Sequence, residues 1–135
     1  MISTWITRAS AVFLGLGGLA LLFASDAILP RLIPGYPPAG AWLGQLLAAA
    51  WLAVAVLNWV SQPAMLGGIY GRPVVVTNAA LYFISATVLL KGVVRPDAPR
   101  VLWVVCALVV LFAGVYGWLM FRGPFERDFQ LQARS

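Results

Sequence analysis

Histidine is absent from this sequence of 135 residues, and cysteine occurs once, at Cys106. A single cysteine excludes an intrachain disulfide, and a chain without histidine has neither a Cys/His zinc site nor a histidine-ligated haem. The Ser-His and Cys-His pairs that activate nucleophiles are excluded as well. We therefore predict no catalytic residue, no metal and no cofactor, and the residue set argues against an enzyme.

Charged residues are also scarce, at 10% of the chain, whereas 62% of the residues are hydrophobic. Soluble domains usually have about 25% charged and about 45–50% apolar residues. A chain of this size cannot hide so much apolar surface from water, because small domains leave much of their surface exposed. The sequence therefore predicts that lipid surrounds the protein.

The excess of basic over acidic residues does not indicate a nucleic-acid partner. The net charge is +5, but the nine lysine and arginine residues are spread singly along the chain. Nucleic-acid binding needs a basic stripe or patch that follows the phosphates. The bases lie instead at the ends of apolar runs, where they set the topology of a membrane protein.

Four apolar runs are each long enough to cross a bilayer as a helix, which takes about 20 residues. They cover residues 6–29, 41–60, 74–92 and 101–121. The sequence predicts an all-α fold, a four-span transmembrane helical bundle that forms one domain over residues 1–135. In the tail, residues 122–135, Phe125 and Phe129 share one helix face, which predicts a short amphipathic segment. A frayed terminus is the alternative.

The first run competes with a signal peptide, but it has one basic residue, Arg8, and a poor cleavage site at residues 24–26. We predict a retained membrane helix that Pro30 ends, followed by a loop rich in proline and glycine. Ala11, Gly15 and Gly18 share one face of this helix. Small residues let helix backbones approach closely in lipid, so this face is a candidate helix–helix contact.

Four spans place both termini on one side of the membrane. Five bases are expected on that side and four on the other: Arg8, Arg72, Arg122, Arg127 and Arg134 against Arg31, Lys91, Arg95 and Arg100. The positive-inside rule then favours cytoplasmic termini, in a bacterial inner membrane.

Two asparagines, Asn58 and Asn78, each lie about one turn inside their predicted helices, on the side that also holds Arg72. One interpretation is a ligand-binding polar layer formed by these amides with Tyr70 and Arg72. The glycine-rich turn around Tyr70 would then hold a lipid headgroup through its backbone N–H groups. The alternative is that the two amides join neighbouring helices and fix their register, while the glycines serve a tight turn.

Asp26 is the only acidic residue inside an apolar run. Its place near the end of that run predicts an interfacial ion pair with Arg31 or Lys91. Proton-coupled transport through Asp26 is one alternative, although transport expects a carboxylate nearer the membrane centre. General-base chemistry through Asp26 is another, and the sequence supplies no second catalytic group for it.

The glycine-rich first run, LGLGGLALL at residues 14–22, and the layout of four short apolar runs resemble the small bacterial membrane proteins of the DoxX-like type. The resemblance implies a four-helix bundle and carries no site residues.

We therefore predict a non-catalytic multi-pass membrane protein, an accessory or structural subunit in a larger membrane assembly or a homo-oligomer. Its partners would be membrane lipids and other membrane helices. The alternative is a binder or carrier of a lipid or small apolar molecule, with the polar layer of Asn58, Asn78 and Arg72 as its polar end.

Overall fold

The computed structural model describes residues 2–61 and 71–121. This part of the chain forms the helices α1 (Ile2–Leu32), α2 (Ala41–Val60), α3 (Gly71–Val93) and α4 (Arg100–Phe121), with a short 3₁₀ helix η1 (Pro38–Gly40) before α2. All four long helices are long and apolar enough to cross a membrane. The predicted all-α bundle of four spans is therefore confirmed, while the predicted amphipathic segment at residues 122–135 lies outside the described residues.

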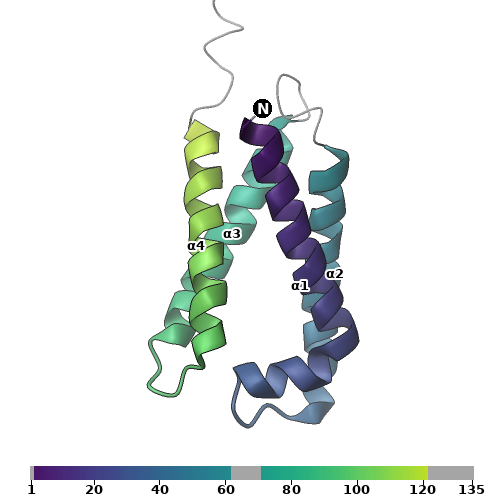
Figure 1. Ribbon diagram of the computed structural model, residues 1–135, viewed down its shortest axis with the longest axis vertical. Helices are drawn as coiled ribbons and strands as arrows, with labels where there is room; N and C mark the ends of the chain where they lie inside the picture. The colour runs from purple at the N-terminus through teal and green to yellow at the C-terminus, as the bar shows by residue number, and fades with distance from the viewer. Residues whose placement is uncertain (1, 62–70, 122–135) are drawn as a thin grey trace, which may run out of the picture.

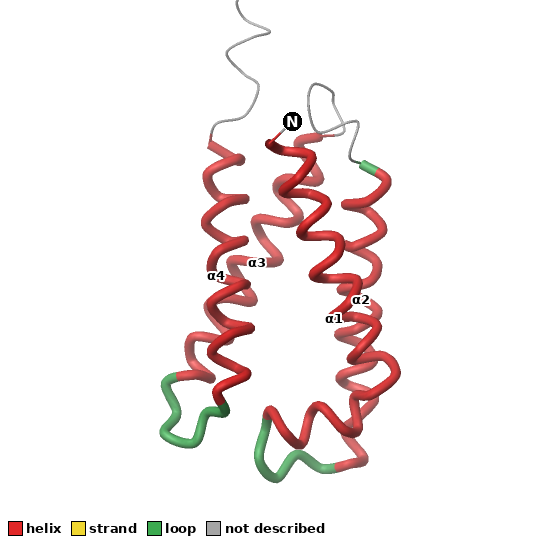
Figure 2. The backbone as a smooth tube through the Cα atoms, viewed as in Figure 1, coloured by secondary structure: helices red, strands yellow, loops and turns green. Residues whose placement is uncertain are grey.

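The four helices form two antiparallel hairpins, α1 with α2 and α3 with α4. Most tertiary contacts lie within a hairpin, and few join the two. Figure 1 shows both hairpins side by side near the N-terminus, and the tube in Figure 2 shows them diverging toward the end where the α1–α2 and α3–α4 connections lie. The bundle is thus two helical pairs that meet mainly at one end.

Glycine allows the close approach of α1 and α2. A methyl group added at Gly18 would lie 2.8 Å from Cγ of Leu52 and 3.2 Å from the carbonyl oxygen of Ala48, so only glycine fits there. One added at Gly15 would lie 3.9 Å from Cβ of Ala55. The predicted small-residue contact face of the first span is therefore confirmed at Gly18, whereas an added Cβ at Gly15 would make an ordinary van der Waals contact. The face serves the fold of the first hairpin itself.

The first helix does not end at Pro30, as the sequence predicts, but continues to Leu32. Its regular backbone is instead broken at Ala24, where φ is −132° and ψ is 28°. A new helical segment follows, and Figure 1 shows it running across the lower end of the view, away from the axis of the first part of α1. Pro30 is tolerated in this segment because it is exposed and removes only the hydrogen bond to the carbonyl of Asp26.

Gly44 near the start of α2 explains why the segment after the kink lies where it does. A Cβ at Gly44 would meet Cδ1 of Leu29 at 2.8 Å and Cβ of Ser25 at 3.1 Å. The missing side chain therefore leaves room for the segment to pack across the first turn of α2. The small cluster of Leu21, Leu29 and Ala48 stabilises this corner.

Candidate functional site

A buried polar cluster lies where the two hairpins meet. It consists of Ser10 on α1, Asn58 on α2, and Asn78 and Tyr82 on α3. Each of these side chains is at most 1% exposed. Asn78 and Tyr82 are four residues apart and therefore share one face of α3. We call these four residues the polar cluster.

The two asparagines form a reciprocal amide pair. Nδ2 of Asn58 donates to Oδ1 of Asn78 at 2.8 Å, and Nδ2 of Asn78 donates to Oδ1 of Asn58. The second proton of the Asn78 amide goes to the carbonyl oxygen of Val74 at 2.8 Å, one turn earlier on α3. The pair thus joins α2 to α3, the last helix of one hairpin to the first of the other.

Ser10 extends the network to α1. Its Oγ accepts a hydrogen bond from Nδ2 of Asn58 at 3.0 Å, donates to Oδ1 of Asn78 at 3.4 Å and lies 2.6 Å from the hydroxyl of Tyr82. Because serine has a single hydroxyl proton, Tyr82 is the donor to Ser10 whenever Ser10 donates to Asn78. One small hydroxyl therefore connects three helices.

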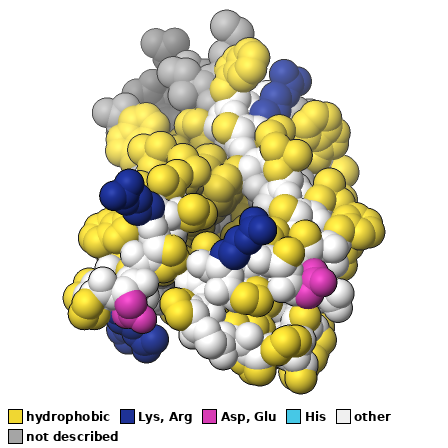
Figure 3. All heavy atoms as spheres, turned by 60° about the horizontal axis from the view of Figure 1, so that its bottom comes forward, with side chains coloured by type: hydrophobic (Ala, Val, Ile, Leu, Met, Phe, Trp, Pro, Cys, Tyr) yellow, Lys and Arg dark blue, Asp and Glu magenta, His cyan; other side chains and the backbone are white. Residues whose placement is uncertain are grey.

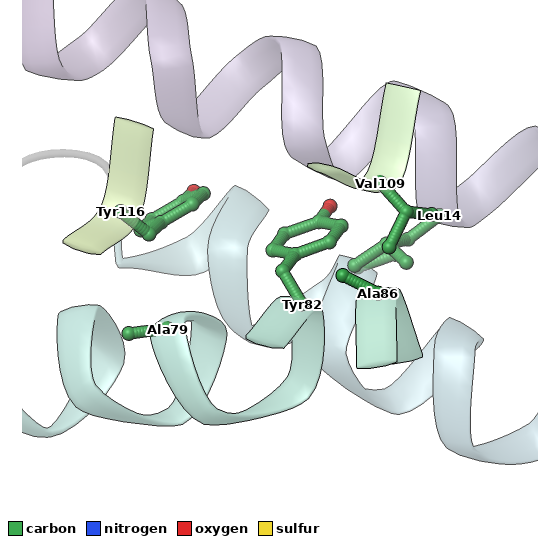
Figure 4. Packing of buried hydrophobic residues seen from close by; sticks show 7 residues of the cluster. Leu14, Ala79, Tyr82, Ala86, Val109 and Tyr116 are labelled. Atoms are coloured by element: carbon green, nitrogen blue, oxygen red, sulfur yellow. The ribbon is translucent and has the colours of Figure 1, made fainter. Parts of the chain in front are cut away.

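Aromatic rings carry the contact on to α4. The ring of Tyr82 stacks on Phe112 with centroids 4.9 Å apart and on Tyr116 with centroids 5.6 Å apart, both at an interplanar angle of 18°. Phe112 also lies 5.5 Å from the ring of Phe13 on α1. Figure 4 shows the two tyrosine rings side by side, with both hydroxyls pointing toward α1.

The hydroxyl of Tyr116 differs from that of Tyr82. It is buried, and no hydrogen-bond partner is found for it in the part of the chain that the structure describes. A buried hydroxyl without a partner costs roughly 1–3 kcal/mol of desolvation free energy. Its nearest polar neighbours on α1 are the hydroxyls of Ser10 and Thr7. Because no hydrogen bond of standard geometry is formed with them, Tyr116 contributes to the junction mainly through its ring.

The chemistry of the polar cluster is limited to hydrogen bonding between neutral groups. None of its four side chains is ionised at neutral pH. Among the described residues, no group of three or more His, Cys, Asp and Glu side chains could hold a metal ion. Interhelical hydrogen bonds in lipid contribute about 0.6 kcal/mol each on average, so the network suits the joining of helices.

The structure brings together two of the four residues predicted for a ligand-binding layer. Asn58 and Asn78 are in direct contact, whereas Arg72 is exposed in the first turn of α3 and Tyr70 lies outside the described residues. Sequence reasoning missed Ser10 and Tyr82. The available signal was weak. Thr7 and Ser10 share one helix face at the start of the first apolar run, and both are fully buried.

The predicted interfacial ion pair of Asp26 with Arg31 or Lys91 is not formed within the described residues. Asp26 lies just after the kink of α1, Arg31 near the end of that helix and Lys91 near the end of α3, and all three are exposed. Over residues 2–61 and 71–121, Asp26 forms no salt bridge with either base. The kink places Asp26 on the segment that runs across the end of the bundle, which leaves it outside the apolar packing.

No protein-family model matches the chain, and neither a curated protein nor a solved structure matches it. The resemblance to the DoxX-like type thus stays a prediction.

Proposed function

We propose that this chain is a non-catalytic, multi-pass protein of a bacterial inner membrane, with both termini in the cytoplasm. In this proposal it packs against other membrane helices, as an accessory or structural subunit of a larger assembly or as a homo-oligomer. The bonding of the polar cluster supports a structural role, because the amides of Asn58 and Asn78 are used by each other and by neighbouring groups. A ligand would have to break these bonds to reach them.

The observation that carries the proposal is the outward face of α4. A Cβ added at Gly114 or at Gly117 would meet no atom within 4 Å, in contrast to the glycines of α1. An open apolar groove lies beside Gly114, lined by Ile6 of α1 and by Leu111 and Trp118 of α4 among others. In lipid, helices associate through close packing at small residues, so this face is suited to receive another helix.

The test is the size and composition of the particle in mild detergent, measured by light scattering and by identification of the chains that co-purify. The proposal expects a defined homo-oligomer or stoichiometric partner chains. Gly114→Leu should abolish that association and leave the chain folded, because no atom of the described residues lies within 4 Å of a Cβ added at Gly114.

Two controls separate association from folding. Ala53→Leu places the same side chain on an exposed position of α2 and should leave the particle unchanged. Gly18→Leu should disrupt the first hairpin itself, because Leu52 and Ala48 already fill the space. A monomeric wild-type particle without partner chains would contradict the proposal, as would an oligomer that Gly114→Leu leaves intact.

A further inference from the structure

The two hairpins are joined along only half of their length. The core that crosses between them includes Leu14 and Ala55 from the first hairpin and Ala86 and Val109 from the second. No residue of α1 beyond Leu14 belongs to this shared core. Farther along, the first hairpin has a separate cluster, built by Leu21, Leu29 and Ala48 without any residue of α3 or α4. On α1 and α2 this packing therefore ends near Leu14 and Trp51, and on α3 and α4 it ends near Leu89 and Val105.

Beyond that level the hairpins enclose a hollow. Figure 1 shows α1 and α2 diverging from α3 and α4 toward the end where the α1–α2 and α3–α4 connections lie. Figure 3, turned so that this end comes forward, shows a depression lined by hydrophobic side chains between two lobes. The hollow is closed toward the polar cluster by the shared core, and the segment of α1 after the kink runs across part of its other end.

The depth of the hollow corresponds to one leaflet of a bilayer. From Leu14, where the shared core stops, to the kink at Ala24, α1 has a length of about 15 Å at about 1.5 Å per residue. Half of a hydrocarbon core about 30 Å thick is also about 15 Å. A membrane-spanning helix of a partner would need a groove through the whole thickness, whereas an acyl chain of one leaflet needs only this depth.

Basic side chains surround the open end. Arg31 follows the kink of α1, Lys91 lies near the end of α3, Arg95 lies in the α3–α4 connection and Arg100 begins α4. All four are exposed, and none forms an ion pair with another described residue. The acidic side chains at this end are Asp26 and Asp97, so the bases are in excess by two (4 − 2). In Figure 3, lysine or arginine side chains stand on both sides of the hollow.

We propose that the hollow between the hairpins holds an anionic phospholipid of the leaflet at this end. Its acyl chain fills the apolar space beyond Leu14 and Val105, and its phosphate lies among the bases at the rim. Basic side chains near a membrane surface favour anionic over neutral lipids. This site is distinct from the outward face of α4 and does not depend on a partner subunit.

The test uses the full chain in mild detergent with phosphatidylglycerol and phosphatidylcholine of matched acyl chains, and native mass spectrometry counts the bound lipids. One phosphatidylglycerol should stay bound per chain, at least fivefold in preference to phosphatidylcholine. Replacing each rim base should weaken retention by about fivefold, so Arg31→Gln with Arg100→Gln should weaken it by about 25-fold.

Matched controls locate the site. Arg72→Gln removes an exposed base at the opposite end of α3 and should leave phosphatidylglycerol bound. The monomer obtained with Gly114→Leu should also keep its lipid, which separates this inference from the proposed association. Equal retention of the two lipids, a loss with Arg72→Gln but not with the rim variants, or a second copy of the chain in place of the lipid would each overturn the inference.

Discussion

The amide pair of Asn58 and Asn78 offers the sharpest measurement of how the hairpins are held together. Replacing Asn78 with leucine keeps the number of side-chain heavy atoms and removes both hydrogen bonds between α2 and α3. At about 0.6 kcal/mol on average and up to about 1.7 kcal/mol for each interhelical bond, the two bonds contribute about 1–3 kcal/mol. Each single variant leaves the partner amide buried and poorly satisfied, and the double variant Asn58→Leu with Asn78→Leu removes that cost.

A double-mutant cycle therefore measures the coupling directly. Unfolding of the wild type, both single variants and the double variant is followed by tryptophan fluorescence as SDS is added to mixed micelles. We expect a coupling free energy of about 1–3 kcal/mol, with the double variant less destabilised than the sum of the single ones. Effects that add to within about 0.5 kcal/mol would refute the reasoning, because residues in direct contact should not behave as independent sites.

Two further predictions concern single side chains. Tyr116→Phe should leave the free energy of unfolding unchanged or raise it, because among the described residues its buried hydroxyl forms no hydrogen bond of standard geometry. Tyr82→Phe should lower that free energy by about 0.6–1.7 kcal/mol through the lost bond to Ser10. The same SDS titration separates the two variants, and equal effects would contradict the assignment. Asp26→Asn should change the free energy of unfolding by less than about 0.5 kcal/mol, because Asp26 is exposed and has no salt bridge among the described residues. A larger loss of stability would indicate that Asp26 does pair with a base.

The sequence predicted the spans well because the length and apolarity of a membrane helix are local properties. The second span, 41–60, coincides with α2, and the other three predicted spans lie inside α1, α3 and α4. The kink of α1 was not predictable in this way. Ala24 favours helix, and the segment after the break packs where Gly44, a residue of another helix, leaves room for Ser25 and Leu29.

Only Asn58 and Asn78 of the polar cluster could be predicted from the sequence, because the other contacts also depend on tertiary packing. An asparagine inside an apolar run is conspicuous, and the antiparallel arrangement of the second and third spans was enough to expect a meeting of Asn58 with Asn78. Ser10 and Tyr82 gave no such signal, since serine and tyrosine occur in membrane helices in many roles. Their part in the network depends on the crossing of α1 over α3, which follows from tertiary packing.

The two hairpins are held by different interactions within each pair and between the pairs. Within the first hairpin, Gly18 lets α1 approach the backbone of α2 at Ala48, and such packing is dense and short-range. Between the hairpins, apolar contact gives little net stabilisation in lipid, because acyl chains are as apolar as the side chains they would replace. Directional hydrogen bonds in the polar cluster therefore fix the relative register of the two hairpins at one end. In the inference above, the acyl chain in the hollow sets the distance between the hairpins at the other end. A substitution in the polar cluster should then alter the spacing at both ends, whereas loss of the lipid should alter only the open end.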